Sequence, residues 1–120
     1  MNKERILLLA AHIEKQPEIN MDIYHECETP MCVAGWAVKL WGDWEKAKEC
    51  HGNGKDGFQT QAAKILGLDD KEPAGHDGLE ESTLADLVCN NDMAFDYETP
   101  AQVGEMLRTL AETEKFVGPN

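Results

Sequence analysis

The sequence predicts an all-α protein, in which about five helices form a compact single-domain bundle around a buried central helix at about residues 30–41. Apolar residues recur at the three- and four-residue spacing of helices in several segments. Capping residues stand at the ends of those segments. No segment alternates apolar and polar residues as an ordinary strand does, although residues 22–25 could belong to a small β-hairpin.

The first helix is expected over residues 2–16. Asn2 is a suitable N-cap, and Pro17 ends the helical pattern because its ring cannot continue a helix. The residues expected to face the core are spaced by three or four positions: Ile6, Leu9, Ala10 and Ile13.

The central helix is expected to begin at Thr29–Pro30 and to end at Gly42. Thr29 can accept hydrogen bonds from the free amides of the first turn, and the missing N–H of Pro30 costs nothing there. Lys39 is the only charged residue of the segment, so this helix is predicted to be buried at the hub of the core. Gly35 weakens a helix, which predicts that another part of the chain packs closely against its bare backbone.

Four later helical segments are expected. Residues 43–50 can form a short helical turn, and residues 58–66 a helix that ends in a left-handed cap at Gly67. Ser82 is a plausible N-cap for the next helix. Thr99 starts a capping box for the last one.

The composition predicts one folded domain over residues 1–120. Hydrophobic residues make up 42% of the chain and charged residues 28%, which is an ordinary globular balance. The sequence contains neither an apolar run long enough to span a membrane nor a secretory signal. We therefore expect a cytoplasmic protein with its four cysteines reduced. That the cytoplasm is that of a bacterial host cell is implied only by the resemblance of residues 27–37 described below.

The charge is large and unevenly distributed. The formal net charge is −12, which would repel nucleic acid and anionic lipid. No Lys or Arg lies between Lys71 and Arg108. A second stretch, residues 18–28, also lacks Lys and Arg and contains the acids Glu18, Asp22, Glu26 and Glu28. From the first stretch we expect the following acids to bind a basic surface of a partner: Glu72, Asp77, Glu80, Glu81, Asp86, Asp92, Asp96 and Glu98.

The segment Cys27–Ala37 reads Cys-Glu-Thr-Pro-Met-Cys-Val-Ala-Gly-Trp-Ala. It resembles a family of short uncharacterised proteins from bacteria and their phages that share a C-G-T-x-x-C-x-A-G-W-A-like segment, with Glu28 here in place of the glycine. Those proteins often have a Leu-Gly-Leu helix end and a later helix begun by Thr-Pro, to which Leu66–Leu68 and Thr99–Pro100 would correspond. The resemblance covers about residues 27–110 in outline, and it implies a bacterial or phage setting but no activity.

A metal site is one alternative. Cysteine and histidine side chains that could supply a tetrahedral N/S ligand set occur close together in the sequence: His25, Cys27, Cys32, Cys50 and His51. The paired C-x2-C hooks of a zinc knuckle are missing. We therefore expect no metal and no other cofactor.

A cysteine-dependent enzyme is the other alternative. Cys32 is expected near a helix N-terminus, where the helix dipole favours a thiolate, and His25, His51 or His76 could act as a base. The neighbouring glutamates oppose ionisation of this thiol, and no histidine stands at a spacing known for cysteine enzymes. The sequence therefore does not predict an enzyme.

These observations together predict a small, acidic, non-enzymatic interaction protein. Carboxylates spaced on a rigid helical frame can occupy sites that normally hold phosphates. With the phage-like resemblance, this predicts an inhibitor of a nucleic-acid-handling or defence complex, such as a CRISPR effector. The tryptophans Trp36, Trp41 and Trp44 are expected in the core and at its rim, with a partner-facing Trp44 as the alternative.

Overall fold

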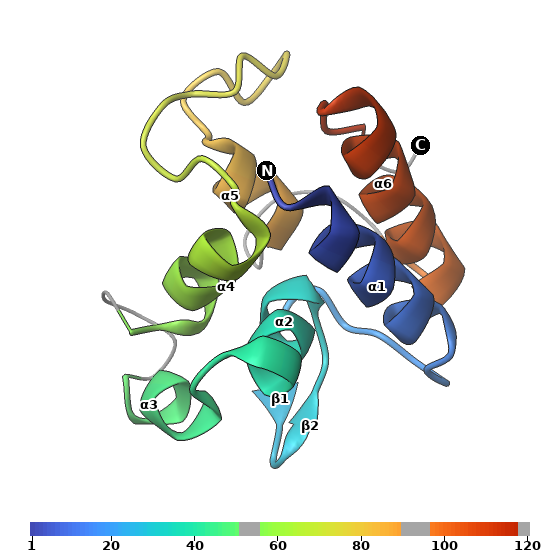
Figure 1. Cartoon of the computed structure of the whole chain (residues 1–120), viewed down its shortest axis with the longest axis vertical. Coiled ribbons are helices and arrows are strands. Elements are labelled where there is room, and N and C mark those ends of the chain that lie inside the picture. Colours follow the sequence, from blue (N-terminus) through green and yellow to red (C-terminus); the bar gives the residue numbers. More distant parts are fainter. Residues whose placement is uncertain (51–55, 90–96, 118–120) are drawn as a thin grey trace.

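The computed structural model describes residues 1–50, 56–89 and 97–117. Within these ranges it holds six helices and one two-stranded antiparallel sheet, so the protein is mostly helical as predicted, and a small hairpin is present (Figure 1). The elements are α1 (Lys3–Glu14), β1 (His25–Glu26), β2 (Thr29–Pro30), α2 (Val33–Trp41), α3 (Trp44–Glu49), α4 (Phe58–Leu66), α5 (Leu84–Cys89) and α6 (Pro100–Thr113).

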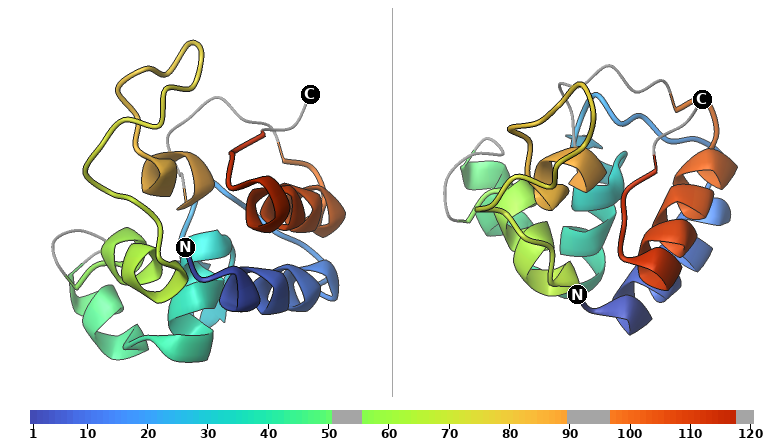
Figure 2. Two further views of the ribbon diagram at one scale, coloured as in Figure 1. Left: turned by 45° about the horizontal axis from the view of Figure 1, so that its top comes forward. Right: turned by 90° about the horizontal axis from the view of Figure 1, so that it is seen from above.

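The helices form two groups that meet at α2. α1 packs side by side with α6, which is its most extensive partner, and α2 packs mainly against α4 (Figures 1 and 2). The hub position predicted for the central helix is confirmed, because α2 also contacts α1, α3, α5 and β2. Its outer side, which carries Lys39 and Leu40, remains exposed.

The first helix follows the prediction. The Asn2 side chain caps α1 by accepting a hydrogen bond from the backbone N–H of Arg5 at 3.1 Å. The four residues predicted to face the core are fully buried: Ile6, Leu9, Ala10 and Ile13. No helix in the described ranges is both long and apolar enough to cross a lipid bilayer.

The predicted start of the central helix at Thr29–Pro30 is wrong by three residues. Thr29 and Pro30 instead form β2, which pairs with β1 in the register His25–Pro30 and Glu26–Thr29. The backbone N–H of Met31 continues the pairing by donating to the carbonyl oxygen of Tyr24 at 3.0 Å. The helix begins only afterwards, because Thr29–Pro30 suits an extended edge strand as well as a helix start.

Cys32 takes the capping position of α2. Its Sγ accepts a hydrogen bond from the backbone N–H of Gly35 at 3.4 Å. Close packing at Gly35 is confirmed, because an added Cβ would lie 2.1 Å from the carbonyl oxygen of Tyr24. Gly35 therefore allows the backbone before β1 to touch the helix directly.

The later helix ends mostly follow the local signals. Gly67 has φ of 68° and closes α4 as predicted, while the N–H of Leu68 donates to the carbonyl of Ala63 at 2.8 Å. The predicted capping box of α6 is present, between Thr99 and Gln102. Asp43 caps α3 within the predicted 43–50 turn.

The start of α5 differs from the prediction by one residue. The cap is not Ser82 but Thr83, whose Oγ1 accepts from the backbone N–H of Asp86 at 3.1 Å. The exchange is reciprocal, since Asp86 Oδ2 accepts from the backbone N–H of Thr83 at 3.0 Å.

The tryptophans lie in the core and at its rim, as predicted. Trp44 is only 9% exposed, so the alternative of a partner-facing Trp44 is wrong. Its Nε1 donates to Glu28 at 2.7 Å, and its ring packs edge-on against Phe58. Trp36 and Trp41 are half-buried on α2.

Candidate functional site

Four of the predicted partner-binding acids lie on the segment between α4 and α5. We call residues 69–81 the acidic loop; it projects beyond the helices as the yellow segment of Figure 1 and of the left view of Figure 2. The four predicted partner-binding acids on it are exposed: Glu72, Asp77, Glu80 and Glu81. Asp92 and Asp96 lie outside the described residues.

The acidic loop has few cations to balance it. Lys71 is its only Lys or Arg. The ion pairs of the described residues join Lys3 to Glu114, Lys48 to Glu28 and Glu45, and Arg108 to Glu14. The carboxylates of the loop take part in none of these pairs, so their negative potential is not neutralised by ion pairing within the described chain.

Asp86 has a structural role that its sequence context did not indicate, because its carboxylate forms hydrogen bonds within the protein. One carboxylate oxygen caps α5, as described above, and the other accepts from Gln59 Nε2 on α4 at 2.7 Å. Both oxygens are therefore bonded inside the protein. Asp86 joins α5 to α4, and it is half-buried rather than displayed at the surface.

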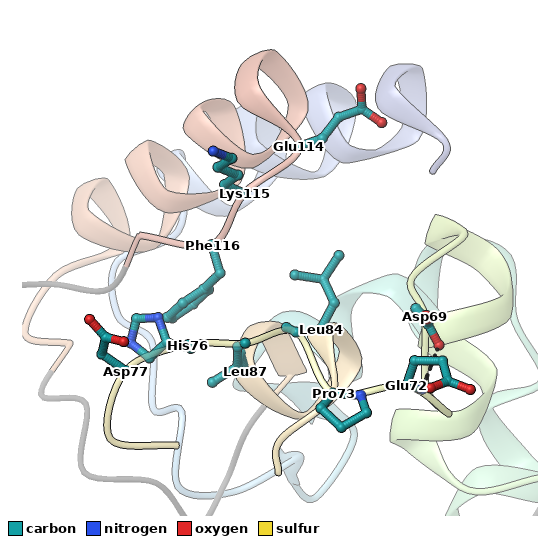
Figure 3. A pocket seen from close by; sticks show the side chains of 12 residues that line it. Asp69, Glu72, Pro73, His76, Asp77, Leu84, Leu87, Glu114, Lys115 and Phe116 are labelled. Atoms are coloured by element: carbon teal, nitrogen blue, oxygen red, sulfur yellow. Dashed lines mark hydrogen bonds between the residues drawn. The ribbon is translucent and has the colours of Figure 1, made fainter. Parts of the chain in front are cut away.

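A pocket of about 600 Å³ lies between the acidic loop, α5 and the segment after α6 (Figure 3). We call it the Phe116 pocket and define it by six residues: Asp69, Glu72, Asp77, Leu84, Leu87 and Phe116. In Figure 3, Leu84 stands between Phe116 on one side and Asp69 on the other. The ring of Phe116 meets that of His76 edge-on at 5.4 Å between centroids.

The charges around this pocket are unequal. Among the described residues that line it, four carry a carboxylate and one carries an ammonium group; Glu114 is the fourth carboxylate, and Lys115 carries the ammonium group. Glu114 pairs with Lys3 at 3.5 Å. Asp69 accepts hydrogen bonds from the backbone N–H groups of Lys71 and Glu72, and these bonds lower the pKa of its carboxyl group. Asp69 therefore stays ionised at neutral pH.

A second hollow, of about 470 Å³, lies at the other end of α6. We call it the Tyr97 hollow and define it by Glu18, Asp22, Glu26, Met31, Tyr97 and Glu98. The predicted partner-binding residue Glu98 thus meets three acids of the other acid-only stretch, and the described lining includes no Lys, Arg or His. The Tyr97 hydroxyl is buried without a partner among the described residues, and burial raises its pKa.

The two acid-lined places are well separated. Glu98 precedes the first residue of α6, whereas Glu114 and Phe116 follow its last. A helix of 14 residues is about 21 Å long. The predicted partner-binding acids therefore do not all lie at one site, since Glu72 and Asp77 line the Phe116 pocket and Glu98 lines the Tyr97 hollow. Glu28, the last acid of the second stretch, lies elsewhere, where Lys48 and Trp44 lower its pKa.

The residues of the metal alternative do not form a ligand set in the described chain. Among the described residues, no three His, Cys, Asp or Glu side chains stand close enough to hold a metal ion. The Nδ1 of His25 lies 2.6 Å from the carbonyl oxygen of Cys27, whose own side chain is exposed, while Cys32 is buried. Cys50 is half-buried, and His51 lies outside the described residues.

The cysteine alternative does not fit the setting of Cys32. This thiol is fully buried, and burial raises its pKa to about 12 despite the bonds from the backbone of Gly35 and Ala34. A thiol with this pKa holds almost no thiolate at neutral pH, so it is a poor nucleophile. Burial also raises the pKa of the Cys89 thiol.

We expect iodoacetamide to alkylate the folded protein first at Cys27, because that side chain is exposed, whereas Cys32 and Cys89 are fully buried. Mass spectrometry of peptides after short exposure measures the order. A Cys27→Ser variant is expected to lose the fast phase, and 8 M urea should make all four cysteines react. Fast modification of Cys32 in the folded protein would contradict this assignment.

Comparison with protein-family models, curated proteins and solved structures gives no match for the chain. The sequence did not indicate Phe116 or Tyr97. One local signal exists for Phe116, since an apolar residue shortly after a helix end often folds back onto the protein.

Proposed function

We propose that the protein is a small, non-enzymatic interaction protein that binds a basic surface of another protein through its acidic loop. The observation that carries the proposal is that four exposed carboxylates of this loop take part in none of the ion pairs of the described chain: Glu72, Asp77, Glu80 and Glu81. Such carboxylates attract a cationic surface and accelerate its approach. The Tyr97 hollow adds a second negative place on the same molecule.

A groove that normally holds nucleic acid is the basic surface that fits these carboxylates best, because its Lys and Arg side chains are spaced to meet phosphates. We therefore propose that the partner is a nucleic-acid-handling or defence protein of a bacterial cell, such as a CRISPR effector, and that binding inhibits it. The bacterial setting rests on the resemblance of Cys27–Ala37 to bacterial and phage proteins.

Charge reversal on the loop tests this function. In the triple variant Asp77→Lys/Glu80→Lys/Glu81→Lys, three exposed carboxylates become ammonium groups. The immobilised protein is exposed to nuclease-treated bacterial lysate, and retained proteins are quantified by mass spectrometry over a salt gradient. We expect the variant to retain the nucleic-acid-binding proteins held by the unmodified chain at least about tenfold more weakly, since charge pairs across an interface dominate its salt dependence.

A matched control keeps the same net charge. The triple variant Glu49→Lys/Glu105→Lys/Glu112→Lys reverses three exposed acids outside the loop. This control should retain the same lysate proteins as the unmodified chain. Added DNA or RNA should displace these proteins from both the control and the unmodified chain. Equal losses in the two triple variants, or retention that nucleic acid does not affect, would contradict the proposed function.

A further inference from the structure

The Phe116 pocket differs from the rest of the acidic loop because it combines an apolar floor with an acidic rim. Leu84 is half-buried and Phe116 is 8% exposed, and both line the pocket, so its floor presents carbon atoms. Asp69, Glu72 and Asp77 belong to the same lining. A volume of about 600 Å³ falls within the range of cavities that hold a bound group, about 300–1,000 Å³.

We propose that this pocket receives one arginine side chain of the protein partner. The proposal rests on the proposed function and makes it specific, because it names the place and the side chain through which the basic surface is held. The aliphatic stem of the arginine would lie on Leu84 and Phe116, and its guanidinium group would face the rim carboxylates.

Charge complementarity selects a cation for the pocket. Of the four lining carboxylates, Glu114 already pairs with Lys3, at 3.5 Å. Asp69, Glu72 and Asp77 form no ion pair in the described chain, and Lys115 is the one ammonium group of the lining. A neutral or acidic side chain would leave these carboxylates uncompensated, which disfavours it.

The arrangement of the carboxylates favours arginine over lysine. In Figure 3, Asp69 and Glu72 lie at one side of Leu84, and Asp77 lies at the other side, beyond His76 and Phe116. A guanidinium group has five donors in a planar fork, so it can bond to carboxylates that approach from different directions. It is also less strongly hydrated than an ammonium group, so an apolar floor costs it less.

The probe is a capped Gly-Leu-Arg-Leu-Gly peptide, titrated into the full-length ¹⁵N-labelled protein and followed by NMR. We expect chemical-shift changes to concentrate at residues 69–77, Leu84 and 114–116. A peptide with citrulline in place of arginine has almost the same shape without the charge, and it should bind at least about fivefold more weakly. The lysine peptide should lie between the two.

Two double variants separate the pocket from the general charge of the loop. Glu72→Gln/Asp77→Asn changes two rim residues, whereas Glu80→Gln/Glu81→Gln removes the same charge from loop residues that do not line the pocket. We expect the first to weaken the arginine peptide by about fivefold and the second by less than about twofold. Overlay of the two variants' spectra with that of the unmodified protein checks that each is folded.

The outcomes distinguish the two proposals. Equal weakening by the two double variants, or shift changes spread along the whole loop, would overturn the arginine pocket while leaving the charge-driven partner interaction intact. Equal binding of the citrulline peptide would overturn the pocket as well. Failure of the lysate experiment would remove the proposed function itself, whichever residues the peptide touches.

Discussion

Replacing Gly35 with alanine is expected to lower the free energy of unfolding by about 3 kcal/mol. The added Cβ would lie 2.1 Å from the carbonyl oxygen of Tyr24 and 3.4 Å from the Cβ of Pro30. The Tyr24 carbonyl cannot move freely, since it accepts the N–H of Met31 at 3.0 Å. The gain of about 1 kcal/mol in helix propensity offsets only part of this clash. Equilibrium urea unfolding measures the difference.

Gly104→Ala is the matched control, because it also places a methyl group on a helical glycine. There the new Cβ would meet the Glu14 side chain on α1 rather than a backbone group. Glu14 can rotate away at the cost of its exposed pair with Arg108, which is worth about 0–1 kcal/mol. We expect the control to be nearly neutral. A cost at Gly35 no larger than at Gly104 would show that the hairpin does not depend on this contact.

Gly35→Ala is also expected to change the shape of the Tyr97 hollow. Glu26 on β1 and Met31 after β2 both line the Tyr97 hollow, so a hairpin pushed away from α2 changes this hollow first. The Phe116 pocket is built by other elements and should keep its shape. In NMR spectra of the variant, shift changes should therefore reach Tyr97 and leave Leu84 unaffected.

The sequence predicted a helix end correctly where the local residues are compatible with only one structure. Gly67 after an apolar helix and Thr99 three residues before Gln102 both have the predicted geometry. Thr29–Pro30 has two solutions, because a residue without an N–H suits both a helix start and an edge strand. Gly35 contacts the Tyr24 carbonyl because the hairpin brings Tyr24 next to α2. The residue spacing within 29–42 predicted a close neighbour for Gly35 but could not identify it as Tyr24.

The candidate site was predictable only as a charge pattern. The absence of Lys and Arg between Lys71 and Arg108 identified the acidic loop, and the four predicted partner-binding acids in it are exposed. The pattern could not show that Asp86 caps α5, since this depends on Thr83 and on Gln59 of another helix. The pocket itself was not predictable, because Phe116 follows α6 and is far along the chain from the loop residues that it meets.

Replacing Phe58 with alanine is expected to lower the free energy of unfolding by about 4 kcal/mol. Phe58 is 1% exposed, and its ring centroid lies 5.0 Å from that of Tyr24, 5.3 Å from His25 and 5.4 Å from Trp44. It thereby joins the hairpin region and α3 to α4. The start of α4 has no side-chain cap at Gly57, so this packing supports the first turn of the helix together with the hydrogen bond from Gln59 to Asp86.

Phe58→Leu separates the loss of volume from the loss of the aromatic contacts. Leucine fills most of the space but cannot stack on Tyr24, so we expect a cost of about 1.5 kcal/mol, against about 4 kcal/mol for alanine. Urea unfolding gives both values, and near-ultraviolet circular dichroism reports the ordering of the aromatic side chains, Trp44 among them. If leucine and alanine cost the same, the ring contacts rather than the filled volume hold α4. If neither costs more than about 1 kcal/mol, the hairpin and α3 are held to α4 by other residues, and Phe58 is not the joint between them.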